Sequence, residues 1–253
     1  EESTLQLLFE PQLDLGTGRI AGLECILNWT DGELGVVSEA RALEAAESAG
    51  LIRELTWWIF NSALRICGDF MHAGLALPIG VRVTASGLLQ PDFPEFVGRA
   101  LRTWKVPAER LVVEIHEAAL IGELDQVKDA LVRLKALGLR LAIDGFGTSS
   151  TSLDNLTQLP LDAARIGAAF VSDMRHAPVH AKIVRSLAHL AQDLGLTVTA
   201  EGVTDDETAL ALSTLTCDNI QGAYVGRPLT APEVLACDIR GPGPVKLPLM
   251  PAP

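Results

Sequence analysis

The sequence predicts a (β/α)8-type barrel preceded by an N-terminal β-hairpin. Short apolar runs alternate with amphipathic helical patterns along most of the 253 residues, and strands that alternate with helices over such a length form a parallel sheet. The runs are apolar on both sides, as expected for strands buried on both faces. Single barrels of this kind are commonly about 250 residues long. A doubly wound open sheet is the alternative, although no GxGxxG or GxxxxGKS/T motif follows a candidate strand.

The first elements are predicted from turn and cap signals. Two strand-like runs, residues 5–15 and 20–29, flank a glycine-rich turn and predict the hairpin. Ser38 is positioned to cap a helix that continues to Ala49 and stops at Gly50. A longer amphipathic pattern then covers residues 53–73.

A βα rhythm follows. The expected strands are Ile79–Val83, Leu111–Ile115, Leu141–Ile143, Ala163–Ile166, Thr197–Ala200 and Asn219–Gln221. The expected helices between them are Glu95–Trp104, Leu124–Leu137, His180–Leu194 and Asp206–Leu215. We therefore assign residues 1–238 to one barrel domain, and expect the Pro/Gly-rich tail 239–253 to be extended.

Composition excludes several classes of protein. A hydrophobic content of 48% supports a large core, and the formal net charge of −12 argues against binding a nucleic acid polymer. The four cysteines have no CxxC spacing and indicate free thiols in a cytoplasmic, reducing compartment. No signal peptide or membrane-spanning run is present. The chain starts at Glu1 without a methionine, so we interpret it as a domain of a longer protein, which leaves a membrane anchor elsewhere open.

Acidic residues stand at or near the ends of several predicted strands. They are Glu24, Glu114, Glu117, Asp144 and Glu201, and Gln221 ends another strand. Parallel barrel strands end at one rim, where barrel enzymes hold their chemistry. Each residue alone is better explained as a helix cap or a solvated loop residue. Together, the carboxylates suggest a site for Mg²⁺ or Mn²⁺.

Five ordered motifs resemble the EAL family of cyclic di-GMP phosphodiesterases. FEPQLDLGTGRIAGLECILNW is similar to the family's opening strands, with LECIL at the Glu-Ala-Leu signature. LVVEIHE resembles its ELEITE strand, and LAIDGFGTSSTSLDNLTQLPLDAARIG its IDDFGTG…LPVD…KID stretch. LTVTAEGVTDDE resembles VVAEGVET, and CDNIQGAYVGRPL resembles CDxxQGYLFSRPL.

The resemblance implies a site that hydrolyses cyclic di-GMP with two divalent cations. On this template, Glu24, Glu114 and Asp144 stand at metal positions, and Glu201 and Arg165 stand at catalytic positions. The implied ligand-binding residues are Glu24, Leu27, Asn28, Arg165, Gln221 and Pro228.

Departures from the family pattern are concentrated at this site. We assign Thr84 to the Asn of the family's NLS motif, and Gly145 to the second Asp of its DDFG motif. Arg165 replaces a Lys, which a planar guanidinium does not imitate. Asn28 replaces a phosphate-binding Arg, and Gly167 replaces an Asp. The metal site is therefore expected to be incomplete and empty, with Mg²⁺ or Mn²⁺ required only if the domain is active.

The sequence thus predicts a degenerate EAL domain: an inactive cyclic di-GMP receptor or a protein-interaction module in bacterial signalling. An active phosphodiesterase with an altered metal site is the alternative. We interpret His116 as a histidine at the strand end with ordinary hydrogen bonds, and a replacement metal ligand is the other reading of this residue. Expected partners are cyclic di-GMP, another protein and a second copy of the chain. Four rim carboxylates without metals are expected to repel each other and a dianionic ligand, with Arg165 compensating only in part.

Overall fold

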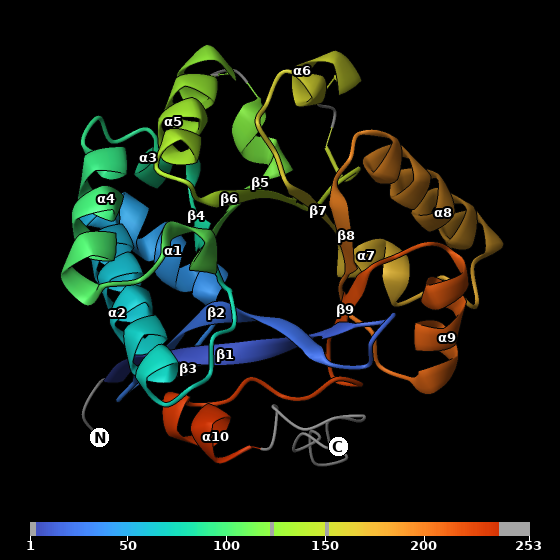
Figure 1. The fold of residues 1–253 in the computed structure, drawn as a ribbon, viewed down its shortest axis with the longest axis horizontal. Helices are drawn as coiled ribbons and strands as arrows, with labels where there is room; N and C mark the ends of the chain where they lie inside the picture. The colour runs from blue at the N-terminus through green and yellow to red at the C-terminus, as the bar shows by residue number, and fades with distance from the viewer. Residues whose placement is uncertain (1–3, 122–123, 150–151, 238–253) are drawn as a thin grey trace.

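The computed structural model describes residues 4–121, 124–149 and 152–237. Nine strands form one sheet in the order β1-β9-β8-β7-β6-β5-β4-β2-β3, and the additional pairing of β1 with β2 closes eight of them into a barrel. Helices surround this ring of strands (Figure 1). The predicted closed barrel is confirmed, and the open sheet is wrong. The expected tail 239–253 lies outside the described residues.

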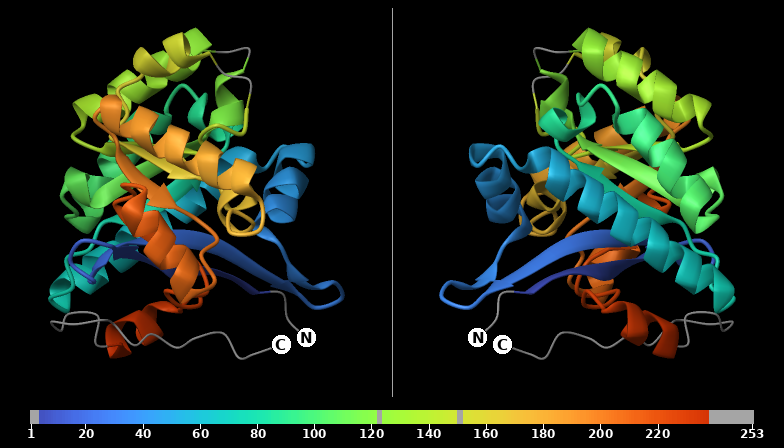
Figure 2. Two further views of the ribbon diagram at one scale, coloured as in Figure 1. Left: turned by 90° about the vertical axis from the view of Figure 1, so that its right-hand side faces the viewer. Right: turned by 90° about the vertical axis from the view of Figure 1, so that its left-hand side faces the viewer.

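The N-terminal hairpin forms as predicted. Strands β1 (Thr4–Asp14) and β2 (Ile20–Asp31) pair antiparallel, and the Asp14 carboxylate accepts a hydrogen bond from the backbone of Thr17 in the turn. The short β3 (Gly35–Val37), which the sequence did not predict, pairs with the end of β2. The end of β2 that pairs with β3 extends away from the barrel (Figure 2).

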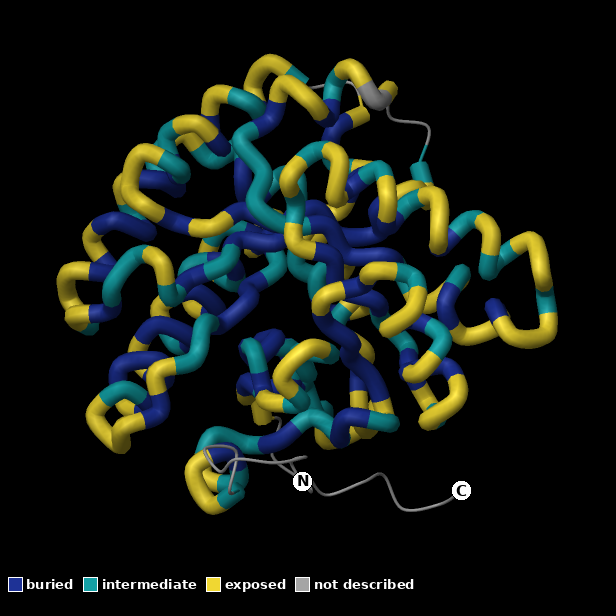
Figure 3. Tube along the Cα trace, turned by 45° about the vertical axis from the view of Figure 1, so that its right-hand side comes forward, coloured by how far each residue is buried: buried dark blue, intermediate teal, exposed yellow. Residues whose placement is uncertain are grey.

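The remaining barrel strands run parallel to β2 and to one another, while β1 is antiparallel to both of its barrel neighbours. Their bounds lie close to the predicted ranges: β4 (Ile79–Val83), β5 (Leu111–His116), β6 (Arg140–Asp144), β7 (Ala163–Ile166), β8 (Thr197–Ala200) and β9 (Asn219–Gln221). Most apolar side chains on these strands are almost fully buried, and the buried strands lie at the centre of the molecule (Figure 3).

The long helices also follow the prediction to within a few residues. They are α1 (Glu39–Ser48), α2 (Ile52–His72), α4 (Phe93–Trp104), α5 (Leu124–Ala136), α8 (Pro178–Asp193) and α9 (Asp206–Thr214). The Ser38 hydroxyl accepts from the backbone of Arg41, so the predicted cap is confirmed. No helix of the described ranges is long and apolar enough to cross a membrane.

Several short helices were not predicted. They are α3 (Ala85–Leu88), α6 (Leu153–Thr157), α7 (Ala168–Val171), α10 (Ala231–Ala236) and the 3-10 turns η1 (Ala108–Arg110) and η2 (Glu117–Leu120). Three of them, α3, α7 and η2, directly follow barrel strands. They define the rim at which the predicted carboxylates stand.

Candidate functional site

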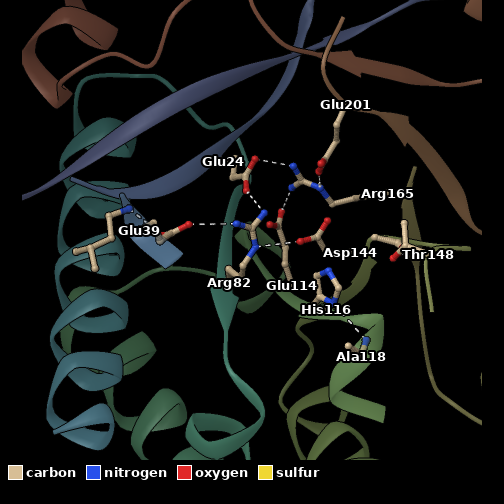
Figure 4. Close-up of polar contacts among 12 residues, drawn as sticks. Glu24, Glu39, Arg82, Glu114, His116, Ala118, Asp144, Thr148, Arg165 and Glu201 are labelled. Atoms are coloured by element: carbon tan, nitrogen blue, oxygen red, sulfur yellow. Dashed lines mark hydrogen bonds and ion pairs between the residues drawn. The ribbon is translucent and has the colours of Figure 1, made fainter. Parts of the chain in front are cut away.

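A buried arginine lies at the centre of the predicted site. The Arg165 side chain, on β7, is only 2% exposed. Its Nε donates to Glu201 over 2.5 Å, and its Nη2 donates to Glu24 over 2.5 Å and to Gln221 over 3.0 Å. Its Nη1 donates to Glu114. One guanidinium therefore joins residues of four other barrel strands or their ends; Figure 4 shows its contacts with Glu24, Glu114 and Glu201.

A second arginine, which sequence reasoning missed, completes the network. Arg82, on β4, donates from Nη2 to Glu24 over 2.9 Å and from Nη1 to Glu39 over 3.1 Å. Its Nε lies 3.0 Å from an Asp144 oxygen. Glu24 thus stands between the two arginines, with one oxygen facing each (Figure 4).

The strand registers explain why these side chains meet. Glu24 lies beside Gly80, and Arg82 lies beside Glu114, in the parallel pairings of β2, β4 and β5. Because side chains two residues apart on a strand share a face, Gly80 and Arg82 both face the interior of the barrel. A Cβ atom at Gly80 would collide with the Glu114 carboxylate, so glycine makes room for that side chain.

Burial and ion pairing act against each other on the carboxyl groups. Burial raises the pKa of Glu114, and the nearby Arg165 reverses only part of this effect. Burial likewise raises the pKa of Glu201 against the attraction of Arg165. At Glu24 the desolvation is outweighed by Arg165 and Arg82, which lower its pKa. The negative charge of the rim is therefore compensated in part, by Arg82 as well as by the expected Arg165, while neighbouring carboxylates still raise the pKa of Glu114 and of Glu201.

A pocket opens at the C-terminal rim, above the arginine network. We call it the mouth pocket; its volume is about 400 Å³. Its lining residues are Glu10, Glu24, Ile26, Glu39, Arg82, Ala168, Glu201, Gly202, Gln221, Gly222 and Ala223. A separate cavity of about 570 Å³ lies at the opposite end of the barrel, where Glu114 and Arg165 form part of its wall.

Comparison with known proteins decides the family. A model of the EAL domain matches residues 1–228. This chain belongs to the EAL family. It is 30% identical over 92% of its length to a cyclic di-GMP phosphodiesterase of Pseudomonas aeruginosa, of which it spans 40%. It is 29% identical over 93% of its length to MucR of the same organism, a bifunctional diguanylate cyclase/cyclic di-GMP phosphodiesterase, of which it spans 35%.

Solved structures support the same assignment. The phosphodiesterase of MucR in complex with c-di-GMP is similar with a TM-score of 0.87 and 28% identity, over 91% of this chain and 94% of that one. The FimX EAL domain of Pseudomonas aeruginosa bound to c-di-GMP is similar with a TM-score of 0.80 and 25% identity, over 89% and 90%.

On β4, the side chain that reaches the site carboxylates is that of Arg82, whereas Thr84, which we expected at the family's Asn position, lies outside the strand. Thr84 follows the strand, and its hydroxyl caps α3 by accepting from the backbone of Gly87 over 3.1 Å. Arg82 could have been recognised in the sequence as the single charged residue of an otherwise apolar strand, IGVRV.

Gly145 and His116 share one space at the rim. Gly145 has a φ of +68°, and a Cβ atom there would lie 2.9 Å from Nε2 of His116 and 3.0 Å from the Thr148 hydroxyl. The other ring nitrogen of His116 accepts from the backbone of Ala118 over 3.2 Å, so this side chain caps η2. His116 thus stands beside the position at which the family has its second Asp.

The predicted ligand-binding residues divide into two groups. Glu24 and Gln221 line the mouth pocket, and Leu27 adjoins it through its backbone amide, which donates to Glu39 over 2.9 Å. Asn28 lies two residues beyond Ile26 on the same face of β2, and neither it nor Pro228 lines the pocket. Arg165 is buried beneath the pocket, so the expected contact with a ligand phosphate does not fit its position.

The residues of this chain do not fit a pair of divalent cations. Every predicted metal carboxylate, Glu24, Glu114 and Asp144, already faces a guanidinium group. Within the described part of the chain, no group of three or more His, Cys, Asp or Glu side chains is arranged to hold a metal ion. A cation entering here would also be repelled by Arg82 and Arg165.

Proposed function

We propose that this chain is a non-catalytic EAL domain that binds cyclic di-GMP without a metal ion. The observation that carries the proposal is the pair of arginines, Arg82 and Arg165, bonded to the carboxylates at the family's metal positions. The guanidinium groups supply the positive charge that holds these carboxylates together. The same charge discourages metal binding.

Loss of hydrolysis follows from the chemistry of guanidinium. In two-metal phosphodiester hydrolysis, the cations lower the pKa of the attacking water and stabilise the leaving oxygen. Arginine is a hydrogen-bond donor without open coordination positions and does not deprotonate in proteins. It therefore cannot replace a metal ion in lowering the pKa of the attacking water or in coordinating the leaving oxygen. Several kcal/mol of transition-state stabilisation are lost, and each 1.36 kcal/mol is about tenfold in rate.

Ligand recognition is supported by what the mouth pocket retains. Its volume of about 400 Å³ lies within the range of roughly 300–1,000 Å³ typical of ligand pockets. Glu24 and Gln221 lie at its floor, and a guanine edge or a ribose hydroxyl would share them with their present partners, Arg165 for both and Arg82 for Glu24. Two similar EAL structures were solved with c-di-GMP. A cytoplasmic location, a protein partner and a second copy remain predictions.

The test of inactivity measures hydrolysis and binding separately. Purified domain is incubated with cyclic di-GMP in Mg²⁺ or Mn²⁺, beside the related Pseudomonas aeruginosa phosphodiesterase. We expect linear dinucleotide to form at least about a thousandfold more slowly than with the relative. We also expect calorimetric binding of cyclic di-GMP to be unchanged by EDTA. Comparable hydrolysis would support the active alternative, and absence of binding would leave a protein-interaction module.

A reversion series sharpens the test. The combined variant Arg82→Asn, His116→Thr, Gly145→Asp, Arg165→Lys removes both guanidinium groups, restores the motif residues at positions 116, 145 and 165, and clears the space beside position 145. We expect it to gain Mn²⁺ binding and measurable hydrolysis. Gly145→Asp alone is the matched control and should gain neither, because both arginines and His116 remain. If wild type, the control and the combined variant all bind Mn²⁺ equally, the arginines do not determine metal binding and the proposal is wrong.

A further inference from the structure

The mouth pocket offers an entering anion one positively charged side chain. Among the described residues that line it, Arg82 is the only cation, while Glu10, Glu24, Glu39 and Glu201 contribute carboxyl groups. The Arg82 side chain is 29% exposed, in contrast to the sealed Arg165. Phosphate groups are bound well by the forked donors of arginine. Arg82 is therefore the group that a ligand phosphate can reach.

Arg82 is already engaged by three carboxyl groups. Glu24, Asp144 and Glu39 each face a different nitrogen of its guanidinium. A phosphate that approaches Arg82 must therefore compete with one of them. Glu39 is the most exposed of the three, at 17% of its side chain, against 5% for Glu24 and 7% for Asp144.

Of the three elements that carry these carboxylates, the one with Glu39 is the least buried. Glu24 belongs to β2 and Asp144 to β6, both strands of the barrel. Glu39 is the first residue of α1, whose only buried residue is Ala42. Besides Arg82, Glu39 accepts one bond, from the backbone of Leu27. One hydrogen bond, to the backbone of β2, therefore links this side chain to the barrel strands besides its contact with Arg82.

We propose that Glu39 is an internal competitor for the anion site on Arg82. When a phosphodiester group enters the mouth pocket, it takes the place of the Glu39 carboxylate at Nη1 of Arg82. This inference relies on the proposed function for the identity of the natural ligand, a cyclic dinucleotide. Burial raises the pKa of Glu39, and the Leu27 amide and Arg82 offset only part of this effect.

The test replaces the competitor while keeping its backbone contact. In Glu39→Gln the amide oxygen still accepts from Leu27, but the negative charge beside Arg82 is gone. Glu44→Gln is the matched control, because Glu44 lies on the same helix, is exposed and does not line the pocket. Calorimetric titrations with cyclic di-GMP and with inorganic pyrophosphate, both in EDTA, report on the natural ligand and on a simple anion.

We expect Glu39→Gln to bind both probes at least about tenfold more tightly than wild type and the Glu44→Gln control, since removal of a nearby charge changes local electrostatics strongly. Adding Arg82→Gln to Glu39→Gln should abolish the gain, whereas adding Arg82→Lys should keep part of it. Circular dichroism checks that each variant is folded. If the variant with Arg82→Gln does not fold, the variant with Arg82→Lys provides the test.

The two probes separate failure of this inference from failure of the proposed function. If Glu39→Gln binds pyrophosphate no better than Glu44→Gln, the internal competitor is refuted, even where cyclic di-GMP binds. If pyrophosphate binding improves but no variant binds cyclic di-GMP, Glu39 is a competitor and the proposed ligand is wrong. An improvement that survives Arg82→Gln would also refute the inference, because Arg82 would not be the anion contact.

Discussion

Two arginine–glutamate contacts that differ in burial also differ in what they contribute to the molecule. At the barrel centre, Arg165 faces Glu24, Glu114 and Glu201, and its side chain is almost completely shielded from water. At α10, Arg227 pairs with Glu233 over 2.5 Å near the surface, where Glu233 also closes a capping box with Thr230. The distances are similar, but the surroundings are not.

The difference lies in what remains when one partner is removed. A surface carboxylate that loses its arginine is solvated by water, so exposed pairs contribute little. A buried carboxylate that loses its arginine keeps its desolvation penalty with no compensation. The central network is thus a condition for folding this barrel with these carboxylates. The α10 pair tunes one helix end.

The largest expected effect is that of Arg165→Met. It leaves Glu24, Glu114 and Glu201 buried without their shared cation, and breaking a buried pair costs about 3–5 kcal/mol. We expect the free energy of unfolding in urea at pH 7 to fall by at least that amount. Arg227→Met is the matched control and should unfold close to wild type. If the two variants lose equal stability, the distinction between the two regions is unfounded.

The second effect concerns the glycine that makes room for Glu114. Gly80→Ala places a Cβ atom into the Glu114 carboxylate, which is fixed by Arg165. Overpacking of a rigid interior costs roughly 1–3 kcal/mol, and we expect a loss of that size in urea unfolding. Gly16→Ala in the β1–β2 turn is the control, because its nearest neighbour, an Asp14 oxygen, is at an ordinary 3.4 Å. Equal stability of both variants would mean that Glu114 moves freely.

The sequence predicted the barrel because its strands and long helices carry strong periodic patterns. It missed β3 and the short helices α3, α6, α7 and α10, which span only three to six residues each. Such segments are too short to show a hydrophobic period, so whether they form depends on capping hydrogen bonds. Thr84, for example, looked like a site residue, but its hydroxyl caps α3.

The site was predicted in part for a related reason. The carboxylates Glu24, Glu114, Asp144 and Glu201 could be gathered at one rim by the ends of parallel strands. Arg165 was named among the site residues, but Arg82 was not, because an ion pair between distant strands depends on register and on which side chain fills which space. The register of β4 and β5 places Arg82 beside Glu114.

The smallest expected effect is the pH dependence of the α10 pair. The Arg227 side chain, followed by the backbone and hydroxyl of Thr230, holds the pKa of Glu233 at about 2, below its ordinary value of 4.5. A depressed carboxyl pKa adds stability that is fully present above the ordinary value and is lost as the pH falls from 4.5 towards 2. Glu233→Gln should therefore lose less stability than wild type between pH 5 and pH 3, measured by urea unfolding at intervals. Because the buried carboxyl groups titrate equally in both proteins, the difference between the two curves isolates Glu233. Parallel curves would show that the ion pair and capping box of Glu233 contribute no net free energy of unfolding. The contrast with the barrel centre would then be greater than proposed.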